Sequence, residues 1–192
     1  MKNNWNDWKN KLINSPNDIE IFEINQNKNC VQDYNTVMEI ITKNVSHIVV
    51  NKYLRILGTS NNMYENIIDF SNTFMENYED GKYIVAHDVF GGLFASEKTI
   101  RYFSPDNLQW EDLGVNYEEF INWISEEDIN DFYQPFLWED ANTLISEVKT
   151  NEGIFIYPFL WTKECDLSTA FKKIVPFKDL LDNNFDSKSK LK

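Results

Sequence analysis

His87 and Asp88, followed closely by the pair Gly91–Gly92, are the residues whose types and spacing most suggest chemistry. An imidazole beside a carboxylate can exchange protons or ligate a metal, and adjacent glycines can let a backbone approach a phosphate. A metal site needs further ligands at suitable spacing, and the sequence contains no HxH, HExxH or CxxC motif. A phosphate loop needs a third glycine and a Lys-Ser/Thr pair, which are also missing.

We therefore expect Asp88, Gly91 and Gly92 to form a structural turn between two strands, with the Asp88 carboxylate accepting backbone N–H groups. The alternative is a small-molecule-binding protein or a hydrolase that uses the turn from His87 to Gly92. The sequence shows no GxSxG or SxxK motif and no Cys–His arrangement for nucleophilic catalysis. We expect no catalytic residue, no metal, no cofactor and no enzymatic activity.

A second candidate site lies in the segment 111–140, which contains ten carboxylates and no Lys, Arg or His. The same segment contains seven aromatic residues, which bury large areas, so we expect aromatic packing inward and acids outward. A negative surface attracts a basic partner and speeds association with it. Solubility alone is the competing explanation. The expected protein-binding residues are Glu118, Glu126, Glu127 and Asp131.

Two tryptophans stand in a repeated triplet, Trp110-Glu-Asp and Trp138-Glu-Asp. Each could anchor the core beside solvated acids, or one could lie exposed in the acidic surface as an anchor for a partner. The sequence leaves both interpretations open.

The composition indicates one globular domain, residues 1–181, with a disordered C-terminal tail, residues 182–192. The net charge of −13 should repel phosphate backbones, so we expect no nucleic-acid partner. We expect no signal peptide and no membrane partner, because no apolar run approaches about 20 residues. Cys30 and Cys165 are far apart and predict reduced thiols in a cytoplasmic protein.

Apolar spacing and turn residues predict about six strands and several helices. One hairpin is centred on Asn51–Lys52, and a second spans 93–103. Asp33 is the expected cap of a helix, and Asn116 begins an expected capping box. The other expected strands are 19–24, 83–86 and 154–157; the expected helices cover 5–12, 63–78 and 137–148, with two more beginning at 117 and 125.

Several motifs resemble those of an uncharacterised bacterial family of unknown function. They are YIVAHDVFGGLFA at 83–95, YFSPDNLQWE at 102–111 and IYPFLWT at 156–162, and the resemblance extends from about Met38 to Pro176. The chain departs from the family at 46–52, where SHIVVNK replaces a stretch that tends to carry glycines and an acid. The family offers no catalytic residues to carry over.

More distantly, the order of strand, Gly-Gly turn, two strands and acidic–aromatic helix is similar to the SUKH superfamily. That resemblance implies an α+β fold with a twisted, mostly antiparallel sheet flanked by helices. It also implies a non-enzymatic, cytoplasmic protein-binding module, and specifically an immunity-type inhibitor of a basic bacterial toxin. A regulatory scaffold is the other function that the resemblance suggests.

Overall fold

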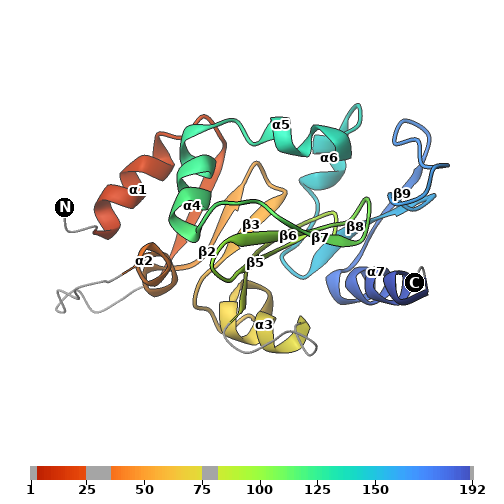
Figure 1. Ribbon diagram of the computed structural model, residues 1–192. Coiled ribbons are helices and arrows are strands. Elements are labelled where there is room, and N and C mark those ends of the chain that lie inside the picture. Colours follow the sequence, from red (N-terminus) through yellow and green to blue (C-terminus); the bar gives the residue numbers. More distant parts are fainter. Residues whose placement is uncertain (1–3, 25–35, 75–81, 191–192) are drawn as a thin grey trace.

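The structure is a computed structural model that describes residues 4–24, 36–74 and 82–190. Its centre is an antiparallel sheet whose strands lie in chain order, covered by helices on both faces (Figure 1). The α+β class and the mostly antiparallel sheet are therefore confirmed. The strands are β1 (Ile19–Glu23), β2 (Val45–Val50), β3 (Leu54–Leu57), β4 (Tyr83–Asp88), β5 (Leu93–Ser96), β6 (Ile100–Ser104) and β7 (Gln109–Asp112).

The helices form two layers around the sheet. Figure 1 shows α1 (Trp5–Ile13), α4 (Tyr117–Glu126), α5 (Asn130–Tyr133) and α6 (Ala141–Ile145) on one side. It shows α3 (Ile67–Phe74) and α7 (Phe177–Lys190) on the other. A separate ribbon pairs β8 (Glu152–Tyr157) with β9 (Phe171–Pro176) and packs on α7. The remaining elements are α2 (Val37–Asn44) and the 3-10 turns η1 (Met63–Glu65) and η2 (Gln134–Phe136).

The two hairpins and the capping box are confirmed. Asn51 and Lys52 both have positive φ, of 47° and 65°, as the two central residues of a type I′ turn require. The Asn116 side chain accepts the backbone N–H of Glu119, and the Glu119 carboxylate accepts the backbone N–H of Asn116. This reciprocal pair fixes the first turn of α4.

Three expected helices are wrong in extent. The helix expected at 63–78 begins at Ile67, because the Asn66 side chain caps α3 by accepting N–H groups of Ile68 and Asp69; residues 75–78 lie outside the described residues. The helix expected from Ser125 begins only at Asn130, as α5, since α4 continues to Glu126. The long helix at 137–148 shrinks to α6, because Asp140 takes a left-handed conformation. Asp33 also lies outside the described residues, and Thr36 caps α2.

The expectation of disorder from residue 182 is wrong for residues 182–190, which continue α7. The outer face of this helix is polar, and that polarity misled the sequence interpretation. Its inner face is anchored by Phe177 and Leu181, both with no exposed surface, and by Asn184, which is 1% exposed. Strands β7 and β9 were not expected, because most residues of each are exposed or half-buried and give little apolar alternation. None of the described helices is both long and apolar enough to cross a membrane.

The C-terminal helix gives a direct stability test. Leu181→Ala should lower the free energy of unfolding by about 2–5 kcal/mol, because it removes a fully buried side chain. Ser189→Ala, on the exposed side of α7, should change it by less than about 0.5 kcal/mol. Urea denaturation measures both; similar small effects would mean that α7 does not dock.

Candidate functional site

The Asp88 carboxylate lies at the end of β4 with no exposed surface. Its Oδ1 accepts the backbone N–H groups of Phe90 and Gly92, both at 2.9 Å. Its Oδ2 accepts the hydroxyls of Tyr102, at 3.0 Å, and Tyr133, at 3.3 Å. Burial raises the pKa of Asp88 to about 6, against the opposing effect of these four donors. The carboxylate thus joins the turn to β6 and α5.

The two glycines serve this turn in different ways. Gly91 has φ of +92°, a conformation that L side chains rarely adopt. Gly92 has no such requirement, but a Cβ there would overlap the Asp88 carboxylate and the Tyr102 hydroxyl. Both glycines are thus explained by the backbone conformation and close packing of the turn.

His87 points away from solvent and is fully buried. Its ring stacks on Phe70, with centroids 4.8 Å apart, and its Nε2 lies 3.2 Å from the carbonyl oxygen of Tyr64. Burial lowers the pKa of His87 to about 3, so the ring is neutral at physiological pH. Every residue from His87 to Gly92 is buried, which leaves no open surface for a ligand at this turn. The hydrolase or ligand-binding alternative at this turn stays untested.

All ten acids of segment 111–140 are exposed, while Phe120 and Ile124 are fully buried and Phe132 is half-buried. We define the acidic surface as Glu118, Glu126, Glu127 and Asp131. Glu126 forms an ion pair with Lys11 of α1. Among the described residues, the side chains of the other three have no hydrogen-bond or ion-pair partner. The structure therefore brings a base, Lys11, to one of the four, which the sequence did not reveal.

Other acids of the segment have local tasks. Glu119 completes the capping box, and the Asp112 and Asp128 carboxylates accept the backbone N–H groups of Gly114 and Asn130. Glu111 and Asp112 also lie on β7, at the edge of the sheet, where charges discourage pairing with another chain. These acids need no partner to explain them.

The β8–β9 ribbon ends in a group of aromatic side chains that the sequence interpretation missed. Tyr157 and Phe171 face each other across the two strands and are 56% and 60% exposed. Phe159 packs edge-on against Tyr157 and stacks on Trp161. We define the aromatic tip as Tyr157, Phe159 and Phe171. The signal was the density of aromatics in 155–161.

Lys172 connects this ribbon to the acidic segment. Its ammonium lies 4.8 Å from the ring centroid of Trp138, in cation–π geometry. Trp138 and Trp110 are both half-buried and pack on the core, as expected for core anchors rather than free interface anchors. The aromatic tip thus lies on a ribbon that touches the segment carrying Glu139 and Asp140.

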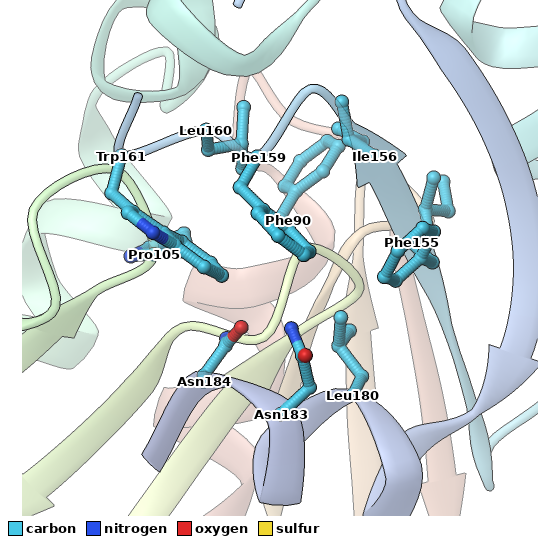
Figure 2. Close-up of a pocket in the computed structure, with 11 residues that line it drawn as sticks. Phe90, Pro105, Phe155, Ile156, Phe159, Leu160, Trp161, Leu180, Asn183 and Asn184 are labelled. Atoms are coloured by element: carbon cyan, nitrogen blue, oxygen red, sulfur yellow. The ribbon is translucent and has the colours of Figure 1, made fainter. Parts of the chain in front are cut away.

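A small apolar pocket lies between the β8–β9 ribbon and α7. Figure 2 shows the Asn183 and Asn184 amides pointing toward Phe90 and the Phe159–Trp161 region. The free space is about 10 Å³, which is the room that a single water needs. Both amide nitrogens lack a hydrogen-bond partner among the described residues. A small-molecule ligand does not fit this pocket.

A larger pocket, of about 320 Å³, lies over β1, β2 and β3. Its wall is completed by the segment 145–150, which starts at the last residue of α6. Three cationic side chains, Lys52, Arg55 and Lys149, line it together with His47. Sequence reasoning missed this cluster, because its members are scattered along the chain and form no motif.

Comparison with known proteins identifies the family of this chain. Residues 2–180 match the family described as "Protein of unknown function DUF2625". The chain belongs to this family. The resemblance to an uncharacterised bacterial family is therefore confirmed, while the comparisons show no link to the SUKH superfamily. No solved structure matches the DUF2625 chain.

Two relatives of this DUF2625 protein are themselves uncharacterised. It is 31% identical to YbfG of Escherichia coli (strain K12) over 112 residues, which are 54% of this chain and 51% of YbfG. It is 30% identical to a Haemophilus influenzae protein over 151 residues, 72% of this chain and 66% of that protein. The chain thus spans about half of the first relative and about two-thirds of the second.

The turn glycine provides a test of the structural interpretation. Gly92→Ala should lower the free energy of unfolding by about 1–3 kcal/mol, since the added methyl displaces the Asp88 carboxylate or the Tyr102 hydroxyl. Lys98→Ala, in an exposed turn, is the control and should be nearly neutral. Equal stability of the two variants in chemical denaturation would contradict the close packing of the turn.

The Asp88 carboxyl should make stability depend on pH. Its pKa in the folded protein, about 6, exceeds its ordinary value of 3.8, so the folded state holds a proton that the unfolded state releases between these pH values. Its contribution to stability therefore falls as pH rises from about 4 to 6, by up to about 3 kcal/mol. Asp88→Asn removes this titration, so the stability of the wild type relative to the variant should decline over the same window. A difference that is constant between pH 4 and 6 would show that Asp88 is ionised throughout.

Proposed function

We propose that this DUF2625 protein is a non-enzymatic protein-binding module that captures a cationic protein. The more specific form of the proposal is an immunity-type inhibitor of a basic bacterial toxin in the cytoplasm. That form takes its support from the distant SUKH resemblance of the motif order, and a regulatory scaffold is its competitor.

The observation that carries the proposal is the aromatic tip. Tyr157 and Phe171 are large, paired and more than half exposed, although burying them would stabilise the fold. Exposed aromatic clusters rimmed by polar residues are typical of protein interfaces, where tyrosine and other aromatics supply most of the binding energy. Apart from the edge-on contact of Tyr157 with Phe159, neither ring packs on another aromatic ring among the described residues.

The charge of the molecule supports a cationic partner. The net charge is −13, and Glu118, Glu127 and Asp131 lie exposed without a local partner among the described residues. Such a field steers a basic protein toward the acidic surface and weakens as salt screens it. Long-range attraction by acids and short-range anchoring by aromatics are complementary, because the first sets the association rate and the second the dissociation rate.

Charge reversal tests this proposal. The probe is the purified product of each gene adjacent to this one, with binding rates measured by biolayer interferometry at low and high salt. The triple variant Glu118→Lys, Glu127→Lys, Asp131→Lys should associate about tenfold more slowly at low salt. Glu126 stays unchanged because it pairs with Lys11. The double variant Tyr157→Ser, Phe171→Ser should dissociate faster.

The matched control reverses Asp69, Asp179 and Asp186, three exposed acids of α3 and α7 on the other side of the sheet. Asp69 and Asp179 lie in the first turns of their helices, as Glu118 does in α4, so both triple variants carry a similar helix-dipole cost. The control should associate faster than the acidic-surface variant. If both triple variants associate equally slowly, the acids act only through the net charge of the protein and not as a binding surface. If no product of a neighbouring gene binds, the immunity-type form of the proposal is contradicted.

A further inference from the structure

Arg55 is a buried cation without a countercharge in contact. Its side chain lies on β3, and the residue is 4% exposed. The guanidinium donates to the carbonyl oxygens of Val148, at 3.0 Å, and Glu152, at 3.3 Å. Among the described residues no carboxylate lies within ion-pair distance of it. Burial lowers the pKa of Arg55 to about 10, while the charges of Asp88, Glu152 and Glu65, all beyond ion-pair distance, act in the opposite direction, so Arg55 is still charged at neutral pH. Buried charges are normally paired, because desolvation without a countercharge is costly.

Arg55 lines the pocket of about 320 Å³ described above. Lys52 and Lys149, both exposed, lie on its wall, and Glu20 is the acid among its lining residues. The lining therefore carries three cations against one carboxylate in a protein whose net charge is −13. Composition predicts the opposite balance, and the carboxylates that act on Arg55 from farther away, Asp88, Glu152 and Glu65, do not line the pocket.

His47 adds a polar group with a free nitrogen. Its Nδ1 lies 3.0 Å from the Ser46 hydroxyl and 3.5 Å from the Glu65 carboxylate, and its ring stacks on Phe22 with centroids 4.2 Å apart. Nε2 has no hydrogen-bond partner among the described residues. Burial lowers the pKa of His47, which keeps the imidazole neutral at physiological pH. The ring is held by Phe22 on one face and by polar contacts at Nδ1, and it presents one unused nitrogen, Nε2.

We propose that this pocket binds a small molecule through a carboxylate or phosphate group, with Arg55 as the buried countercharge. Arg55 uses two of its N–H groups on carbonyls and keeps others for the oxyanion, and an arginine fork matches such groups well. Lys52 and Lys149 attract the ligand, and His47 donates a further hydrogen bond from Nε2–H in the tautomer whose Nδ1 accepts the Ser46 hydroxyl. The exposed face of Phe22 and the side chains of Val49, Ile145 and Val148 suit an apolar portion of the ligand.

The volume fits this class of ligand. Small-molecule sites typically enclose about 300–1,000 Å³, so the pocket suits a metabolite of modest size and not a nucleic acid or a protein segment. The pocket lining shares no residue with the acidic surface or the aromatic tip. It goes beyond the proposed protein binding and does not depend on it.

The test uses inorganic phosphate and benzoate as separate probes, which distinguishes the two oxyanion chemistries. Calorimetric titration of the whole protein, at ionic strength held constant with NaCl, should show saturable binding of at least one probe below about 10 mM. Lys52→Gln with Lys149→Gln should weaken binding at least about fivefold, because two attracting charges are lost. Arg55→Lys should weaken it about tenfold or more, since the fork is replaced by a point charge.

The control variant carries Lys163→Gln and Lys173→Gln, which remove two exposed charges outside the pocket. It should bind as the wild type does. The surface variants at Lys52 and Lys149 keep the test valid if Arg55→Lys fails to fold, which circular dichroism reports. No binding of either probe at about 10 mM, or equal affinity in the pocket and control variants, would overturn the proposal.

Discussion

The buried carboxylate of Asp88 is the contact on which the arrangement of the sheet and its helices depends. Two of its four donors are backbone groups of its own turn, and two are hydroxyls of Tyr102 on β6 and Tyr133 on α5. Tyr133 then packs against Tyr53, with centroids 4.4 Å apart. One carboxylate thus links the β4–β5 turn to the helical layer through hydrogen bonds. Removing it would leave several buried donors unpaired, each costing about 1–3 kcal/mol.

A second polar centre positions the acidic surface. The Asn17 amide donates to the carbonyl oxygens of Ile124 and Glu127, and its oxygen accepts the backbone N–H of Ile129. Asn17 is 8% exposed, so these bonds are shielded from water. They fasten the end of α4 and the start of α5 to the segment before β1. The exposed carboxylates are therefore carried on a backbone that is held from within, and their spacing is set before any partner arrives.

The local parts of this fold could be predicted from the sequence, because they obey short-range rules. Asn51–Lys52 and the Asn116 capping box determine a turn and a helix start within a few residues, and both were predicted correctly. Strand β9 and helix α7 escaped prediction, since their local signals are weak and the structure holds them by packing against each other and β8. The pocket of about 320 Å³ that Arg55 lines also escaped prediction. Its lysines, Lys52 and Lys149, are 97 residues apart in the sequence and come together only in the folded chain.

The order of the strands in the main sheet has a consequence for how the chain reaches its native state. Each strand pairs with the next one along the chain, from β1 to β7. The β2–β3, β4–β5, β5–β6 and β6–β7 connections are short, whereas those from β1 to β2 and from β3 to β4 are longer and carry α2 and α3. Closing short loops costs little entropy, and folds rich in local pairings form quickly. The sheet can thus grow strand by strand in the direction of synthesis, while the ribosome still holds the later residues. The Asp88 carboxylate would acquire its Tyr102 donor when β6 emerges and its Tyr133 donor afterwards, so this acceptor would close the sheet before it secures the helices.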